Sequence, residues 1–481
     1  MQTKRSPPKA VIRLLVLCLL LPSLSSARAA GEPALTLTAF GAVGDDRADD
    51  TQALQEAFRQ VEGRCLDGEG RTFRVRGTLR VSTDFCLENA RLRQDVAFFD
   101  TRQWIAGDCP VERDPEALID CRDPAMAGPL PAGLTDYLYT RTLLIRPDDD
   151  ESQITVALRN VTIDRGADPQ SGARSDAAGI WIANAASLLL DGVEVTGAGK
   201  GYGVMIVNSA NVTIRDLHLH DLVWAPYAGD TPLSLAAVQQ TGWNTVPMRE
   251  FRRAGDRSAP RSSFYGTRVQ EQLSCLAIEG SHNVSLERLR IDGCRARFAE
   301  GDIPWQADGV GIGQSSRDIR IQNASITDTW EGIDIVGGGR GVSGVTISGA
   351  EISNSFNYAV KVGHNASDIS VADSTLGRAG LAGIIFYGPV RNALVSKVRI
   401  DEPGSVFYAG MLQRPWWQEL AGIVASPDGS GAYPAEVALD RVTVRGGRDC
   451  RFGLLNLTPA SLAREDLTAS GCEVARERRS P

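Results

Sequence analysis

The feature that most constrains this chain is a segment of alternating apolar residues that recurs along most of its length. Each copy begins with a small residue, usually glycine, and neighbouring copies such as those at Gly179 and Gly203 lie 24 residues apart. Short alternating runs broken by Gly, Asn, Asp and Ser are typical of strands and turns. A unit this short cannot bury its apolar face alone, so its copies must stack. The eight copies are Gly179–Ile182, Gly203–Ile206, Cys275–Ile278, Gly309–Ile312, Gly332–Ile335, Ala359–Val362, Gly383–Phe386 and Gly422–Ala425.

Stacked copies predict an all-β fold, a right-handed parallel β-helix in which each repeat forms one coil of a solenoid. Inward-facing Ile, Val and Leu residues would then align into one continuous core. A β-propeller, the competing all-β repeat, needs about 40 or more residues per blade, so the short period argues against it. The first coil has an open edge, which a short helix is expected to cap. This helix is predicted by Asp49–Thr51, which can cap its N-terminus, and by the apolar stripe Ala53, Leu54, Ala57 and Phe58.

The first residues are typical of a secretory signal. Four basic residues come first, an apolar run from Leu14 to Leu24 follows, and Ala27 and Ala29 supply the small residues that a signal peptidase reads. We therefore expect residues 1–29 to be a signal peptide, residues 30–472 to form a single β-helix domain and residues 473–481 to form a charged tail. The mature protein is expected to be secreted or periplasmic, with no stable membrane anchor.

The cysteines agree with export. Cys18 lies in the signal, and the other eight of the nine are an even number, which predicts disulfides in an oxidising compartment. Their spacing favours local pairs. A zinc site is the lesser alternative, because the chain has no close Cys-x-x-Cys pair. The expected pairs are Cys65–Cys86, Cys109–Cys121, Cys275–Cys294 and Cys450–Cys472.

The segment Phe40–Ala57 reads Phe-Gly-Ala-Val-Gly-Asp-Asp-Arg-Ala-Asp-Asp-Thr-Gln-Ala-Leu-Gln-Glu-Ala. It resembles the opening signature of the pectate lyase superfamily, which includes bacterial polygalacturonases, rhamnogalacturonases and related epimerases. The coils that follow resemble the same families over nearly all of the mature chain. The resemblance implies a parallel β-helix that acts on polysaccharide. It leaves the reaction open, because many chemistries share this scaffold.

Three insertions interrupt the repeat at the same turn of the coil, at residues 224–272, 295–307 and 402–420. Long loops on one side of a solenoid usually form its binding face. The first insertion holds an arginine-rich segment that includes Arg253, and guanidinium groups there could bind uronate carboxylates. A solvated surface loop is the alternative. The insertions also carry five of the eight tryptophans, whose indole faces suit sugar rings: Trp224, Trp243, Trp305, Trp416 and Trp417.

Alternate residues of the recurring strand point away from the core, and they form an outer row across the stacked coils. Polar and charged groups concentrate in three neighbouring coils of this row and of a second row that begins each strand. The outer row is Trp181, Met205, Ala277, Gly311, Asp334, Lys361 and Ile385, and the second row is Tyr202, Ser274, Asp308, Glu331, Tyr358 and Ala382.

Asp308 and Glu331 occupy equivalent places on neighbouring coils, so their charges repel and their pKa values should separate. Glycoside hydrolysis needs such an acid and base pair. Ala307–Val310 resembles the polygalacturonase Asn-Thr-Asp-Gly motif, and Trp330–Ile333 lies where that family has its Asp-Asp pair. Tyr358 stands at the family's histidine position, and His364 comes at the far end of its strand. Substrate binding is assigned to Asp334, Tyr358, His364, Trp181, Trp305, Trp330 and Arg253.

Two other functions remain open. In uronate lyases of this fold a basic side chain removes the C5 proton, often with calcium, so Lys361 beside Glu331 and Asp334 could act as the base of a lyase or an epimerase. Lys361 could instead be a simple ion-pair partner of Asp334. The third possibility is a non-catalytic glycan-binding or surface structural protein. We expect an acidic polysaccharide as the partner. We expect no nucleic-acid partner, because 59 acidic residues outnumber 51 basic ones.

Six Asn-x-Ser/Thr sequences resemble glycosylation sites, but we expect them to mark coil corners. Asparagine tolerates left-handed backbone geometry, and a β-branched strand start follows it. The six are Asn160, Asn211, Asn283, Asn323, Asn365 and Asn456.

Overall fold

The structure, a computed structural model, describes residues 35–61, 63–95, 141–149, 151–166, 178–198, 202–224, 227–228, 231–232, 274–298, 301–303, 307–313, 315–405, 420–459 and 462–479. All of them belong to one compact unit, Leu35–Pro481. The predicted signal peptide, the pair Cys109–Cys121 and most of the three predicted insertions lie outside the described residues. No helix within these ranges is long and apolar enough to cross a membrane.

Among the described residues, the recurring segments form a sheet of twelve strands in which every neighbouring pair is parallel. We call it the outer-row sheet, because it carries the outer row. Its strands are β4 (Leu79–Val81), β6 (Arg141–Ile145), β8 (Ala178–Ala183), β11 (Val204–Val207), β16 (Ser274–Glu279), β20 (Asp308–Ile312), β23 (Ile333–Val336), β26 (Tyr358–Gly363), β29 (Ala382–Tyr387), β32 (Ala421–Ser426), β34 (Phe452–Asn456) and β36 (Val474–Arg478).

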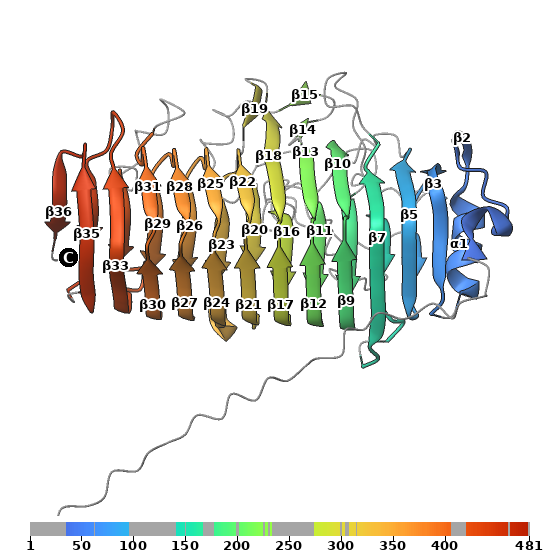
Figure 1. The fold of residues 1–481 in the computed structure, drawn as a ribbon, viewed down its shortest axis with the longest axis horizontal. Helices are drawn as coiled ribbons and strands as arrows, with labels where there is room; N and C mark the ends of the chain where they lie inside the picture. Colours follow the sequence, from blue (N-terminus) through green and yellow to red (C-terminus); the bar gives the residue numbers. More distant parts are fainter. Residues whose placement is uncertain are drawn as a thin grey trace, which may run out of the picture. The chain divides into compact units, whose positions relative to one another are not determined.

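A second sheet, of 22 strands among the described residues, supplies the other two sides of each coil. Its strands stack in chain order, as Figure 1 shows for β9, β12, β17, β21, β24, β27 and β30. They are β1 (Leu35–Thr36), β2 (Asp45–Asp49), β3 (Cys65–Val75), β5 (Phe85–Gln94), β7 (Ile154–Asp164), β9 (Ala185–Asp191), β10 (Glu194–Ala198), β12 (Ala210–Arg215), β13 (His218–Trp224), β17 (His282–Glu287), β18 (Arg290–Phe298), β19 (Gly301–Ile303), β21 (Arg317–Gln322), β22 (Ser325–Thr327), β24 (Val342–Ser348), β25 (Glu351–Ser353), β27 (Ala366–Ala372), β28 (Thr375–Gly377), β30 (Val390–Ser396), β31 (Arg399–Asp401), β33 (Ala435–Arg445) and β35 (Arg464–Ser470).

The register between coils follows the repeat. In the outer-row sheet, Met205 pairs with Trp181 on one side and with Ala277 on the other, as the alternation predicts. The intervening residues, such as Val204 and Ile333, point inward and are fully buried in one continuous core. Burying each such side chain contributes about 1.5–3 kcal/mol relative to leaving it in water. The predicted parallel stacking of coils is therefore confirmed.

The small residue at the start of each copy has a steric cause. A Cβ atom added at Gly332 would lie 2.3 Å from Cγ2 of Ile352 and 2.5 Å from the carbonyl oxygen of Ala359 on the next coil. A Cβ atom at Gly309 would lie 2.5 Å from the carbonyl oxygen of Gly332. Coils can therefore approach to hydrogen-bonding distance here only because these positions lack a side chain.

The predicted capping helix is present as α1 (Thr51–Gln60), which buries Leu54, Ala57 and Phe58 and packs against β4 and η1 (Leu37–Phe40). The residue at its N-terminus, Asp50, does not cap the helix as expected. The Asp50 side chain makes no cap bond to the helix. Instead its buried carboxylate accepts hydrogen bonds from the backbone N–H groups of Val43 (2.6 Å) and Gly44 (3.2 Å), because this close turn would otherwise leave both donors unpaired.

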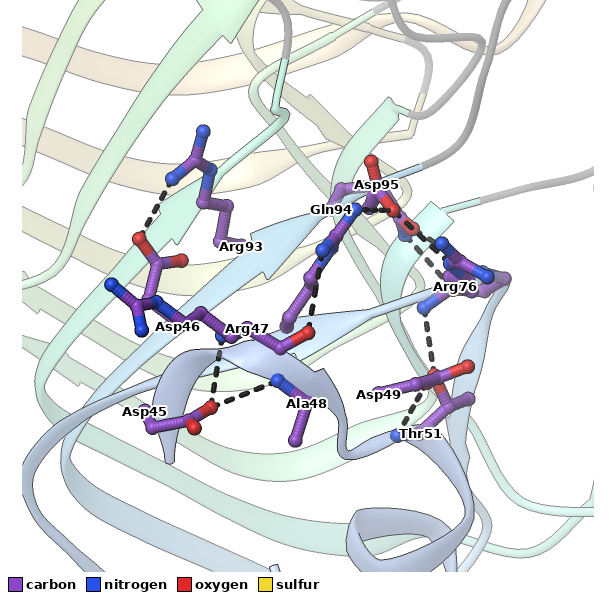
Figure 2. A network of polar contacts seen from close by, with 12 residues as sticks. Asp45, Asp46, Arg47, Ala48, Asp49, Thr51, Arg76, Arg93, Gln94 and Asp95 are labelled. Atoms are coloured by element: carbon purple, nitrogen blue, oxygen red, sulfur yellow. Dashed lines mark hydrogen bonds and ion pairs between the residues drawn. The ribbon is translucent and has the colours of Figure 1, made fainter. Parts of the chain in front are cut away.

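Exposed polar contacts surround this cap, as Figure 2 shows. Asp45 accepts from the N–H groups of Arg47 and Ala48, and Asp49 accepts from the N–H group of Thr51. Side-chain pairs then join neighbouring coils. They are Asp46 with Arg93 at 2.8 Å and Asp95 with Arg76 at 3.1 Å. The signature segment Phe40–Ala57 thus closes the first coil.

Three of the expected disulfides are present, Cys65–Cys86, Cys275–Cys294 and Cys450–Cys472. Five of the six Asn-x-Ser/Thr asparagines have a positive φ, which confirms them as coil corners: Asn160, Asn211, Asn283, Asn323 and Asn365. Asn456 is the exception. It is buried in β34, and its side-chain oxygen accepts from the N–H and the hydroxyl of Thr458.

The charged tail was predicted to begin at residue 473, which is too early. Residues Val474–Arg478 form β36, which pairs with β34 from Phe452 to Asn456. The boundary was predicted from the charge of the segment alone. β36 is the last strand of the described sheet, and most of its side chains are exposed, so it carries charged residues that an interior strand would not.

Candidate functional site

The register of three neighbouring strands assembles the predicted site. In the outer row, Gly311 of β20 pairs with Asp334 of β23, and Asp334 pairs with Lys361 of β26. Asp308 begins β20, and Glu331 lies two residues before β23. Backbone hydrogen bonds hold these starts together, since Gly309 N–H donates to the carbonyl oxygen of Glu331 at 2.9 Å.

The four charged side chains meet in one cluster, which we call the carboxylate–lysine cluster (Asp308, Glu331, Asp334 and Lys361). One carboxylate oxygen from each acid lies within 4.8 Å of the other two. Lys361 Nζ lies 3.2 Å from Asp334 Oδ2 and 3.7 Å from Glu331 Oε1. The backbone N–H of Glu331 donates to Asp308 Oδ1 at 3.3 Å, so the two predicted catalytic acids are joined directly.

The members of the cluster differ in their access to water. The side chain of Glu331 is 4% exposed, that of Asp334 is 15% exposed and that of Lys361 is 24% exposed. Asp308 is half-buried. Glu331 therefore relies on protein partners, and Asn357 Nδ2 donates to its Oε1 at 3.1 Å.

Burial and mutual repulsion set the protonation of this cluster. Burial raises the pKa of Asp308 well above its ordinary value, and the charge of Glu331 raises it further. Burial likewise raises the pKa of Asp334 to about 6, although the Lys361 ammonium opposes this shift. Burial alone would lower the pKa of Lys361, but the surrounding carboxylates, Asp334 first, raise it above its ordinary range. Lys361 is therefore a cation at neutral pH, and Asp308 retains a proton more readily than an ordinary aspartate.

Three solved structures resemble the described coils. The A-module of Azotobacter vinelandii mannuronan C-5 epimerase AlgE4 is 13% identical, with a TM-score of 0.60, over 93% of this chain and 98% of that chain. The AlgE6 A-module is 13% identical, with a TM-score of 0.54, over 93% and 96%. A mutant tailspike protein of E. coli bacteriophage HK620, solved in complex with a pentasaccharide, is 12% identical, with a TM-score of 0.51, over 93% and 70%.

The chain has the right-handed parallel β-helix fold. At these identities the likeness shows the fold alone. No protein-family model matches the sequence, and no curated protein is significantly similar to it.

A resident calcium ion does not fit the cluster of this β-helix. Calcium takes six to eight oxygen ligands. The described cluster offers three carboxylates, and the Lys361 ammonium lies 3.2 Å from one of them, where it would repel a bound cation. The ammonium itself supplies the positive charge that these oxygens need.

Three aromatic residues assigned to substrate binding are buried. Trp330 is 1% exposed and stacks on Phe356, with ring centroids 5.1 Å apart. Tyr358 is also buried in the core cluster. Trp181 is covered too, because its ring packs edge-on against Tyr202 at 5.4 Å and under the guanidinium of Arg141 at 4.8 Å. These positions stabilise the fold in the described structure and do not offer a face to a sugar.

The outer row is less exposed than the alternation suggests. Met205, Ala277 and Ile385 point away from the core, yet they are buried like Trp181. Alternation predicts the face of the sheet on which a side chain lies, and it carries no information on what covers that face. Trp305 and Arg253 lie outside the described residues.

His364 lies at the end of β26, in a corner with a positive φ, and its ring meets Tyr387 edge-on at 5.1 Å. Burial lowers the pKa of His364, and the nearby Lys361 cation lowers it further, so the imidazole is neutral at neutral pH. Its role in substrate binding remains a prediction.

Asn357 is the site residue that sequence reasoning missed. It is 2% exposed, and it holds the Glu331 carboxylate from the next coil. A polar residue between the apolar Phe356 and the aromatic Tyr358, 26 positions after Glu331, was the available signal, since that spacing is close to one coil.

Proposed function

We propose that this protein is a polysaccharide-active enzyme that hydrolyses a glycosidic bond at the carboxylate–lysine cluster. The observation that carries the proposal is the pair of adjacent acids in which Asp308 has a raised pKa while Glu331 is held by Asn357 and Lys361. A proton donor beside a second carboxylate is the apparatus of glycoside hydrolysis. The fold is compatible with this activity, since the similar solved structures include a mannuronan epimerase module and a tailspike bound to a pentasaccharide.

The roles follow from the environment of each group. Asp308 donates its proton to the glycosidic oxygen as the bond to the anomeric carbon breaks. Glu331 supplies the second carboxylate, and the separation of less than 4.8 Å between its oxygen and that of Asp308 favours the retaining mechanism over the inverting one, which needs room for a water between the two groups. In the retaining mechanism Glu331 attacks the anomeric carbon as the glycosidic bond breaks, and water then releases the sugar from Glu331. Lys361 balances the charge of Glu331 and Asp334, and Asn357 positions Glu331. The proton that Asp308 gives to the leaving oxygen is returned to Asp308 by the water that releases the sugar.

The alternative of a lyase or epimerase with Lys361 as base has less support. A base must be unprotonated before it can act, and the carboxylates around Lys361 raise its pKa. An acidic substrate also draws little support from the described site, where Lys361 already pairs with Asp334 and Glu331. The expectation of an acidic substrate therefore rests on the arginine-rich sequence around Arg253.

We also propose that the protein is exported. The predicted signal at 1–29 supports this, and so do the three disulfides, because disulfides persist in oxidising compartments.

The first test is Asp308→Asn, assayed on a panel of neutral and uronate polysaccharides. Removal of a general acid should lower kcat by roughly 10²–10⁴-fold. A matched control is Glu351→Gln, an exposed acid on β25 that should keep full activity. The readout is new reducing ends without the ultraviolet absorbance of an unsaturated uronate. Absorbance would indicate a lyase, binding without new reducing ends would indicate a non-catalytic protein, and an active Asp308→Asn would exclude the assigned role.

A further inference from the structure

Between β6 and β34, the outer row is accessible over only a short part of its length. Register places its described members in line from β6 to β34. On either side of the cluster these side chains are at most 7% exposed. They are Leu144, Trp181, Met205 and Ala277 before the cluster, and Ile385, Val424 and Leu455 after it. A sugar could not contact these coils on this row.

The side chains at the start of the neighbouring strands are buried as well. In the second row, the neighbours of Asp308 and Glu331 are at most 8% exposed, and they are Tyr202, Ser274, Tyr358 and Ala382. The residues one step further back are also buried, and they are Ala307, Trp330, Asn357 and Leu381. Between β6 and β34, the partly exposed positions that remain in these two rows are Asp308, Gly311, Asp334 and Lys361, which we call the accessible window.

The ends of three strands near the window are more open. Glu279, the last residue of β16, is exposed, while Val336 of β23 and Tyr387 of β29 are half-buried. His364 follows β26 and is half-buried beside Tyr387. Within the described residues, the window therefore communicates with solvent on the side where the strands end.

From this distribution we infer that the enzyme is exo-acting: it takes the end of a polysaccharide chain, which enters across the strand ends and stops at the carboxylates. The inference rests on the proposed function. The window covers three strands, about 10 Å along the stack, which is comparable to a disaccharide. An internal bond of a long chain laid along the coils would place sugars over the buried rows on both sides.

The same geometry assigns a positioning role to Tyr387. Its ring lies two residues beyond Ile385 on β29, at the open side, and His364 packs against its edge. An aromatic face at that place can stack on the sugar that follows the chain end. Tyr387→Ala should raise KM about tenfold with kcat little changed, whereas Leu394→Ala, which removes an exposed apolar side chain from β30 in the other sheet, should change neither. A loss of kcat at unchanged KM would exclude this role.

Cleavage of end-blocked chains tests the inference. The full chain is incubated with polygalacturonate, alginate and arabinoxylan, each used intact and with both chain ends derivatised with a bulky group. On the polymer that it hydrolyses, the enzyme should release one product of uniform short length from the first sample onward. The viscosity should fall slowly, and blocked chains should resist.

The outcomes separate the two proposals. A ladder of product sizes with a rapid fall in viscosity, or equal cleavage of blocked chains, would overturn exo-action and leave hydrolysis standing. An absence of new reducing ends on the broader neutral and uronate panel would overturn hydrolysis and the inference together.

Discussion

At the scale of single residues, the site depends on one ammonium group among three carboxylates. Lys361 contacts Asp334 and Glu331, and among the described residues it is the cation that ion-pairs with these acids, whose oxygens lie within 4.8 Å of one another. Losing one partner of a buried ion pair is costly because the other charge remains buried. Lys361 is therefore expected to support both folding and activity.

The first residue-scale prediction is that Lys361→Met lowers the free energy of unfolding by about 2–4 kcal/mol at pH 7. The raised pKa of Lys361 keeps its contribution present at neutral pH, and the contribution is lost only as pH rises above its ordinary range. The effect should shrink as pH falls below about 6, because Asp334 then takes up a proton. Urea unfolding at pH 4, 7 and 9 measures it.

Lys397→Met provides the control. Lys397 pairs with Asp373 at 3.3 Å, but its side chain is 50% exposed, so its loss should cost less than about 1 kcal/mol. Equal losses in the two variants, or a Lys361 effect that is independent of pH, would contradict the proposed role of the ammonium.

At the scale of elements, the site depends on how closely β20, β23 and β26 approach. Gly332 lies between Glu331 and β23, where a Cβ atom would meet Ile352 and the backbone of Ala359. Gly332 therefore sets both the spacing between the coils and the position of the Glu331 carboxylate. This explains why a structural glycine stands directly beside a proposed catalytic acid.

Gly332→Ala should therefore lower the free energy of unfolding by about 1–3 kcal/mol, because the added methyl group forces the coils apart. It should also lower kcat, since Glu331 moves with the strand. Gly429→Ala is the matched control, because nothing lies within 4 Å of a Cβ atom there. Thermal unfolding and initial rates measure both effects, and a Gly332→Ala variant with unchanged stability would refute the steric argument.

At the scale of the whole molecule, a stack of coils has an open strand edge at each end, and this edge must be covered. The first coil is closed by α1 and by the turn that Asp50 holds through Val43 and Gly44. This cap belongs to the signature segment from which the resemblance to the pectate lyase superfamily was drawn. That segment therefore marks the fold, and it lies at the start of the solenoid while the cluster lies on β20, β23 and β26.

Asp50→Ala should cost about 1–3 kcal/mol, because it leaves two backbone donors without their partner. Since each coil contacts mainly its neighbours, the loss should be local to the first coils. Hydrogen exchange should rise there and remain unchanged around β23, and the folded protein should keep its specific activity. A selective loss of kcat without faster exchange would point instead to a role in catalysis.

The sequence determined the architecture and the membership of the site. A period near 24 residues fixes which residues become neighbours on successive coils, because a stacked strand has no freedom to shift its register without turning its apolar side outward. Asp308, Glu331, Asp334 and Lys361 were grouped on that basis, and the structure brings them into contact. The pairing of three disulfides was predicted separately, from the short separation of their cysteines along the chain.

Only the tertiary structure decided which side chains are exposed to water and which acidic group retains its proton. Trp181 and Tyr358 lie in the rows that the repeat predicts, and Trp330 lies one residue before the second row, yet all three are buried, while Asp308 is half-buried. Periodicity fixes the direction of a side chain relative to its own sheet, and this is a local property. Burial and pKa depend on every group packed around it, and those groups come from coils distant in the sequence.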